Sequence, residues 1–97
     1  MIKNFKSKLA RDVFDGEVSA RSRKLPVHLH SKAQRLMDQL NVATRLATLS
    51  LPPGNMLEAL RGNLKDFYSI RINSQWRIIF KWEDGNAFEV DILGSYL

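Results

Sequence analysis

Two alternating runs joined by three polar residues constrain the fold of this chain more than any other feature. Apolar and polar residues alternate through Phe67–Ile72 and again through Trp76–Trp82, and Asn73-Ser74-Gln75 lies between the two runs. Such alternation is typical of β-strands with one buried face, and a polar connector this short is typical of a hairpin. The sequence therefore predicts an antiparallel hairpin in this region.

The predicted hairpin has an apolar face and a cationic face. Pairing across the connector places Arg71 opposite Arg77, and like charges at opposite positions, about 5 Å apart at Cβ, repel one another. An anion bound between the arginines would offset this repulsion, and so would a neighbouring acid such as Glu89 or Asp91. The other face is predicted to carry the core residues Ile70, Ile72, Trp76, Ile78, Phe80 and Trp82.

The first half of the chain predicts two helices. Ser7 is a candidate N-cap for a helix that ends at Phe14, and a strand is expected before it at Met1–Phe5. Apolar residues at helical spacing, including Leu36 and Leu40, predict a longer helix from about Val27 to Ala43. His28 and His30 lie in its first turn and are expected to be surface residues, because a spacing of two does not place them on one helix face.

The second half of the chain predicts strands. Met56–Leu60 is expected to be a strand before the hairpin, and Phe88, Val90 and Ile92 alternate as the inward-facing residues of a last strand. Helices followed by strands indicate an α+β fold, with two N-terminal helices packed on one face of a mostly antiparallel sheet. The uncovered face would then carry Arg71, Arg77 and Lys81.

Length and charge narrow the class of protein. The chain has 97 residues, which predicts one domain spanning 1–97, and its net charge of +5 favours a polyanion or an acidic protein as partner. It has no cysteine, which excludes a disulfide scaffold and a thiolate nucleophile. The N-terminus does not resemble a secretory signal and no apolar run is long enough to cross a membrane, so a soluble, cytoplasmic protein without a membrane partner is expected.

The segment from Leu51 to Gly85 carries a resemblance to a known family. Its pieces PPGN, LEAL followed by Arg-Gly, SIRIN and QWRI-x-F occur in order, and Met1-Ile2-Lys3 followed by Phe5 matches the same family's opening. Together they resemble the HigB branch of the RelE/ParE toxin superfamily over essentially the whole chain. The resemblance implies a RelE-like fold and the toxin of a type II toxin–antitoxin system.

The resemblance also implies an activity and its partners. It implies an endoribonuclease that cleaves mRNA on the ribosome without a metal or other cofactor and is neutralised by a HigA-type helix-turn-helix antitoxin. Operator DNA would be contacted only through that antitoxin. By the same resemblance, the expected catalytic residues are Arg71, Arg77, Glu58 and Tyr96, and Arg61 and Lys65 are expected to bind RNA. Lys81 is also expected to bind RNA, because it lies on the uncovered face of the predicted sheet.

Departures from the family pattern leave alternatives open. Many members end in Asp-Tyr-His, whereas this chain ends Gly94-Ser95-Tyr96-Leu97, so only Tyr96 matches that ending. Some members carry His at the position of Glu58, which makes Glu58 a candidate general base. A ParE-like protein that binds gyrase without chemistry, or a degenerate toxin that only binds its antitoxin, are the alternative functions.

Overall fold

A four-stranded antiparallel sheet covered on one face by helices forms this protein. The computed structural model describes residues 1–94. The helices are α1 (Lys8–Phe14) and α2 (His30–Val42), and the strands are β1 (Glu58–Ala59), β2 (Tyr68–Arg71), β3 (Trp76–Glu83) and β4 (Asn86–Gly94), in the spatial order β1-β2-β3-β4. Short 3-10 helices occur at Ser22–Lys24, Val27–Leu29, Leu46–Ser50, Pro53–Asn55 and Gly62–Leu64. The predicted α+β class is confirmed.

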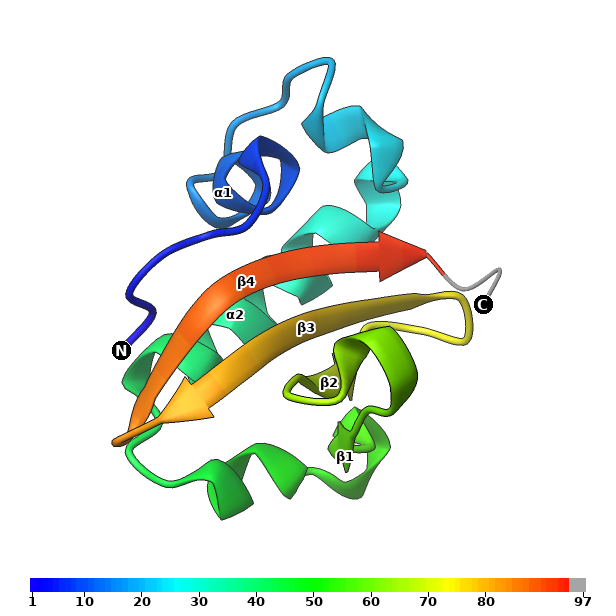
Figure 1. The fold of residues 1–97 in the computed structure, drawn as a ribbon. Coiled ribbons are helices and arrows are strands. Elements are labelled where there is room, and N and C mark those ends of the chain that lie inside the picture. The colour runs from blue at the N-terminus through cyan, green and yellow to red at the C-terminus, as the bar shows by residue number, and fades with distance from the viewer. Residues whose placement is uncertain (95–97) are drawn as a thin grey trace.

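The helices lie on one side of the sheet. In Figure 1, α2 passes behind β3 and β4, and α1 lies next to β4 at the opposite end of the sheet from β1. Helix α1 packs against α2 and β4. The predicted Leu36 and Leu40 of α2 are buried together with Ile70, Ile72, Ile78 and Phe80 of the hairpin. None of the helices within residues 1–94 is long and apolar enough to cross a membrane.

Ser7 begins α1 as predicted. Its hydroxyl oxygen accepts a hydrogen bond from the Ala10 N–H at 3.1 Å and donates to Asp91 of β4 at 2.5 Å. Gly16, with φ of 76°, follows the end of the helix, a conformation that glycine adopts without strain. One N-cap hydroxyl thus satisfies a helix terminus and fixes that helix to the sheet.

The hairpin register matches the prediction. Arg71 pairs directly with Arg77 and Ile70 with Ile78, so both arginines lie on the face that the helices leave open. Trp76 and Trp82 were predicted to be core residues, but they are only partly buried and pack at the margin of the core. Both lie near the ends of β3, where the core thins.

The first two predicted strands differ from the prediction. Met1–Phe5 forms two isolated parallel bridges, Ile2 with Ala87 and Phe5 with Val90, rather than a strand. The predicted strand 56–60 is regular only at Glu58–Ala59. Only a short stretch of chain lies beside β4 in the first case and beside β2 in the second, so few backbone groups pair.

A bulge in β4 explains why the prediction for Phe88 is wrong. Ile79 pairs with Asp91 but Lys81 pairs with Phe88, so β4 contains one extra residue, and Glu89 there has φ of 52°. A bulge shifts the alternation of side chains by one position. Phe88 therefore lies on the open face beside Lys81, whereas Val90 stays buried.

Candidate functional site

Four side chains from three strands meet on the open face of the sheet. Glu58 of β1 pairs with Ser69 of β2, and Arg71 of β2 pairs with Arg77 of β3. The Arg77 guanidinium forms an ion pair with Glu58, and its Nη1 donates to the Ser69 hydroxyl at 2.8 Å. This cluster of Glu58, Ser69, Arg71 and Arg77 is called the arginine cluster below.

The counter-ion of Arg77 is not the one suggested by the sequence. Glu89 pairs with Lys81 at 3.0 Å, and Asp91 accepts the Ser7 hydroxyl, so neither acid contacts Arg77 in residues 1–94. Glu58 takes that place from the opposite side of β2. Its side chain is 49% exposed and that of Arg77 28%, so water and solutes reach the pair.

Arg71 is held more loosely than Arg77. Its Nη1 lies 3.0 Å from the sulfur of Met56, which is only a weak acceptor. Met56 has a left-handed backbone with φ of 48°. Because no carboxylate in the described residues pairs with Arg71, its guanidinium retains most of its capacity to bind an anion.

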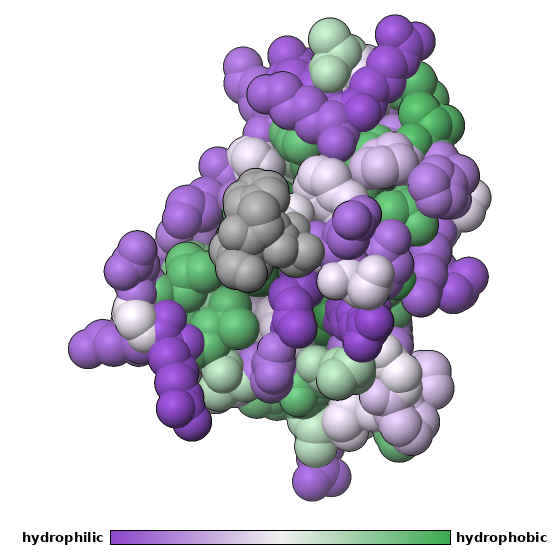
Figure 2. Space-filling view, turned by 90° about the vertical axis from the view of Figure 1, so that its right-hand side faces the viewer, coloured by the Kyte–Doolittle hydropathy of each residue, from purple (hydrophilic) through white to green (hydrophobic). Residues whose placement is uncertain are grey.

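A hollow of about 460 Å³ lies beside the arginine cluster. Its lining includes Arg77, Glu58 and the predicted RNA-binding Arg61, together with apolar Leu60, Leu64, Ile79 and Leu93. Figure 2 views the side of the molecule that carries β1 and the β2–β3 connection, where hydrophilic side chains surround hydrophobic surface. The hollow therefore offers both charge and an apolar wall to a ligand.

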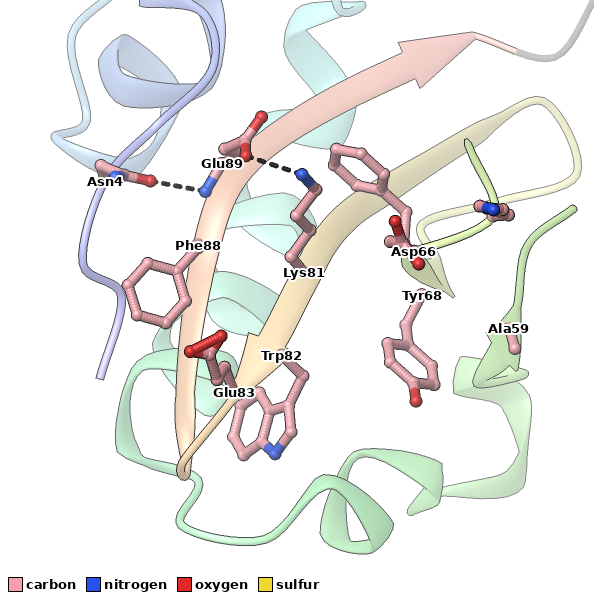
Figure 3. A pocket seen from close by; sticks show the side chains of 11 residues that line it. Asn4, Ala59, Asp66, Tyr68, Lys81, Trp82, Glu83, Phe88 and Glu89 are labelled. Atoms are coloured by element: carbon pink, nitrogen blue, oxygen red, sulfur yellow. Dashed lines mark hydrogen bonds and ion pairs between the residues drawn. The ribbon is translucent and has the colours of Figure 1, made fainter. Parts of the chain in front are cut away.

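The other two predicted RNA-binding residues lie elsewhere on the open face. Lys65 and Lys81 line a second hollow of about 600 Å³, which also carries Asp66, Tyr68, Trp82, Glu83, Phe88 and Glu89 and is called the aromatic hollow below. Figure 3 shows Lys81 reaching toward Glu89, with Tyr68 and Trp82 on neighbouring strands. The predicted binding residues are thus divided between two hollows, and Tyr96 lies outside the described residues.

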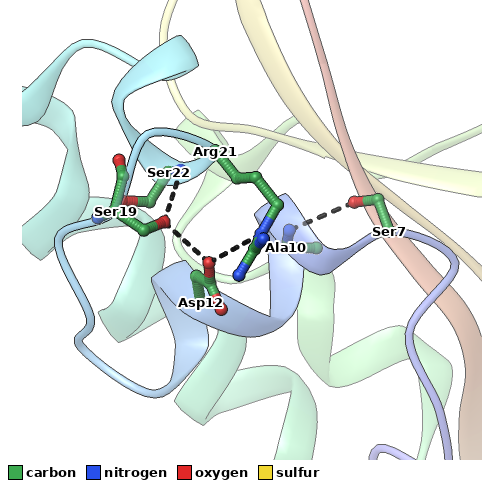
Figure 4. Close-up of polar contacts among 6 residues, drawn as sticks. All are labelled: Ser7, Ala10, Asp12, Ser19, Arg21 and Ser22. Carbon is green, nitrogen blue, oxygen red and sulfur yellow. Dashed lines mark hydrogen bonds and ion pairs between the residues drawn. The ribbon is translucent and has the colours of Figure 1, made fainter.

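A polar cluster near α1 has a structural role. The Asp12 carboxylate is buried and accepts the Ser19 hydroxyl at 2.7 Å and the Arg21 Nε at 3.2 Å (Figure 4). The hydrogen bond from Ser19 lowers the pKa of Asp12 below its ordinary value of 3.8, with Arg21 acting in the same direction and burial opposing them. These contacts order the loop after α1, which lies away from the arginine cluster.

His30 was predicted to be exposed, and that prediction is wrong. Its side chain is buried and its Nε2 lies 2.8 Å from both the Ser22 and Leu25 carbonyl oxygens. His28 is exposed as expected. Among residues 1–94, no three His, Asp or Glu side chains lie close enough to hold a metal ion.

Ser69 is the residue of the arginine cluster that sequence reasoning missed. It is fully buried, and its hydroxyl oxygen is the acceptor that fixes Arg77. The available signal was the alternation in Ser69-Ile70-Arg71, which places Ser69 and Arg71 on the same face. Since Ser69 shares this face with two arginines, its hydroxyl could have been predicted as part of the site.

Comparisons with known proteins agree with this architecture. A family model described as the RelE-like toxin of type II toxin–antitoxin system HigB matches residues 3–93. Toxin HigB-1 of Vibrio cholerae serotype O1 is 38% identical over 97 residues, which cover 100% of this chain and 95% of that protein. An uncharacterized protein of Haemophilus influenzae is 36% identical over 64 residues, or 66% of this chain and 63% of that protein.

A solved structure shows the same fold. The crystal structure of YafQ from Escherichia coli strain BL21(DE3) superposes with a TM-score of 0.58 over 98% of this chain and 92% of YafQ, at 15% identity. At that identity the likeness concerns the fold alone. Taken with the sequence matches, the chain belongs to the family of RelE-like HigB toxins of type II toxin–antitoxin systems. It is the toxin component of such a system.

Proposed function

We propose that this toxin is an endoribonuclease that cleaves mRNA on the ribosome, without a metal ion, and thereby inhibits translation. The observation that supports the proposal most strongly is the pair of facing arginines, Arg71 and Arg77, on the open face of the sheet. Two guanidinium groups at facing positions suit a phosphate, because each can donate two parallel hydrogen bonds to its oxygens.

The proposed reaction is an internal transfer at one phosphate. The 2′-oxygen of a nucleotide loses its proton and attacks the adjacent phosphorus, and the bond from phosphorus to the 5′-oxygen breaks. The products are a 2′,3′-cyclic phosphate and a 5′-hydroxyl. Negative charge on the non-bridging oxygens increases on the way to the transition state, so Arg71 and Arg77 stabilise that state more than the substrate.

Glu58 is the proposed acceptor of the 2′-proton. Its carboxylate lies against the Arg77 guanidinium, so a phosphate that binds Arg77 would bring its neighbouring 2′-hydroxyl close to Glu58. Proton transfer requires such reach before any other property of the base. Tyr96 is the proposed donor of the proton to the 5′-oxygen, and Arg61 a contact to the RNA backbone.

The proposed protein partner is a HigA-type helix-turn-helix antitoxin. A type II toxin requires an antitoxin, and the net charge of +5 suits a partner with an acidic surface. The toxin would reach operator DNA only through that antitoxin. Co-expression with the antitoxin gene should restore growth and co-purify both proteins, and failure of both results would contradict this partnership.

Cleavage of translated mRNA tests the proposed reaction. Purified toxin is added to a translation mixture, and a reporter mRNA is examined by primer extension and end-group analysis. We expect cuts with 2′,3′-cyclic phosphate ends, and no cuts when initiation is blocked so that the mRNA carries no ribosomes. Uncut mRNA, with inhibited DNA supercoiling by gyrase in a parallel assay, would instead favour the gyrase-binding alternative.

A further inference from the structure

The sheet opens into the aromatic hollow where β2 ends and β3 continues. Pairing between these strands stops at Tyr68 with Phe80, whereas β3 extends to Glu83. Lys81, Trp82 and Glu83 therefore have no partner strand on that side, and the segment leading into β2 diverges from them. The resulting hollow has a volume of about 600 Å³, which is larger than the volume of a single flat ring.

Aromatic rings in fixed positions line this hollow. Tyr68 stacks on the buried Phe80 with ring centroids 6.1 Å apart, and Trp82 packs edge-on to the same ring at 6.3 Å. Tyr68, Trp82 and Phe88 are each only partly buried, so each leaves ring surface open to a ligand (Figure 3). Because Phe80 supports Tyr68 and Trp82, little side-chain freedom is lost when a ligand stacks on them.

The charges of the hollow favour a base over a phosphate. Asp66, Glu83 and Glu89 line it against Lys65 and Lys81, three carboxylates against two ammonium groups. Lys81 is already paired with Glu89 at 3.0 Å. Asp66 and Glu83 form no ion pair and accept no side-chain hydrogen bond from residues 1–94, so both can accept hydrogen bonds from a ligand.

The open-face part of the hollow, which carries Lys81 and Phe88, lies in line with the arginine cluster, whereas Tyr68 and Trp82 line the hollow from the face that carries Phe80. Lys81 follows Arg77 by four residues on the same face of β3, which corresponds to about 13 Å at roughly 3.3 Å per residue. A stacked nucleic acid strand advances about 3.4 Å per nucleotide. An RNA strand with one phosphate at Arg77 would thus bring a base to the hollow within about four nucleotides.

We propose that the aromatic hollow binds one base of the RNA substrate, and that it selects a base with an exocyclic amino group over uracil. The base would stack on Trp82 or Tyr68, and its amino group would donate to Glu83 or Asp66. Adenine, cytosine and guanine carry such a group and uracil does not. The inference rests on the proposed endoribonuclease function and adds a determinant of where the toxin cuts.

Binding can be measured without cleavage. The chain has two tryptophans, so Trp76→Phe leaves Trp82 as the only tryptophan to report on the hollow. Tetramers of deoxyadenosine or deoxyuridine lack the 2′-hydroxyl and cannot be cut. We expect saturable quenching of Trp82 by the adenine tetramer and roughly tenfold weaker binding of the uracil tetramer.

Charge-neutral variants identify the selecting groups. Glu83→Gln combined with Asp66→Asn should bring the two tetramers within about threefold of each other, because an amide can donate to uracil oxygens as well as accept. Asp38→Asn is the matched control, since Asp38 is an exposed carboxylate on α2 and outside the hollow. The proposal would be overturned if the protein with Asp66 and Glu83 intact bound both tetramers equally, or if neither tetramer quenched Trp82. Quenching of Trp82 by a lysine-containing peptide, and by neither tetramer, would also overturn the proposal.

Cleavage patterns separate this inference from the proposed function. If the function and the inference hold, primer extension shows cuts from which uracil is depleted at one position, and Glu83→Gln with Asp66→Asn removes that depletion while cutting continues. Cuts whose positions are the same in this variant and in the unsubstituted toxin would overturn the inference alone. Complete absence of cuts by the unsubstituted toxin would overturn the function itself.

Discussion

Replacing Arg77 by alanine should affect stability and activity by separate routes. The substitution leaves the fully buried Ser69 hydroxyl without its partner, which costs about 1–3 kcal/mol. The lost ion pair with the half-exposed Glu58 adds about 0–1 kcal/mol. For a domain of this size each kcal/mol lowers Tm by about 4–8 °C. Loss of a donor to the transition-state phosphate should reduce cleavage by roughly 10²–10³-fold.

A second substitution distinguishes these two effects. In Arg77→Ala with Ser69→Ala, both hydrogen-bond partners are absent, so most of the lost stability should return. Cleavage should remain as low as in the single variant, because the guanidinium is still missing. Thermal melts and primer extension are measured on the same preparations. Recovery of cleavage together with Tm in the double variant would show that Arg77 acts on structure alone and would refute the reasoning.

Three further substitutions have definite expectations. Arg71→Ala should reduce cleavage less than Arg77→Ala with little change in Tm, because Arg71 contacts only a weak acceptor. The Ser19 hydroxyl lowers the pKa of Asp12, so the folded state gains stability above pH 3.8 and loses it as the pH falls through the folded pKa. Thermal melts between pH 2 and 5 should show this loss in the unsubstituted protein and not in Asp12→Asn. His30→Ala should lower Tm by several degrees because it removes a buried donor from two carbonyls, whereas His28→Ala should not, and equal melts for the two would contradict this.

The arginine pairing was predictable because a strand has a strict side-chain period of two. With a turn at Asn73-Ser74-Gln75, alternation alone places Arg71 and Arg77 on one face and Ile70 and Ile78 on the other. The structure confirms each of these positions. The identity of the counter-ion could not be obtained in this way. The register of β1 depends on the turn at Gly62–Leu64, and alternation does not determine which residue of β1 meets Ser69.

The bulge in β4 and the burial of His30 have no clear mark in the sequence. The bulge in β4 places a non-glycine residue, Glu89, at positive φ, so no glycine or asparagine marks it in the sequence. The alternation with Val90 therefore predicts an inward-facing Phe88. The burial of His30 could not be predicted, because its hydrogen-bond partners are backbone carbonyls of the preceding segment and every residue type carries a backbone carbonyl. Phe88 reaches the open face, and with it the aromatic hollow, only through this bulge.

The most direct test of the account is cleavage by a variant that lacks both arginines. Arg71→Ala with Arg77→Ala is expressed beside the unsubstituted toxin, with Ser69→Ala added to maintain stability and Tm measured as a control. Primer extension on mRNA from these cells should show cuts for the unsubstituted toxin and none above background for the variant. Cuts at the same positions and to the same extent in both would contradict the claim that these arginines form the active site.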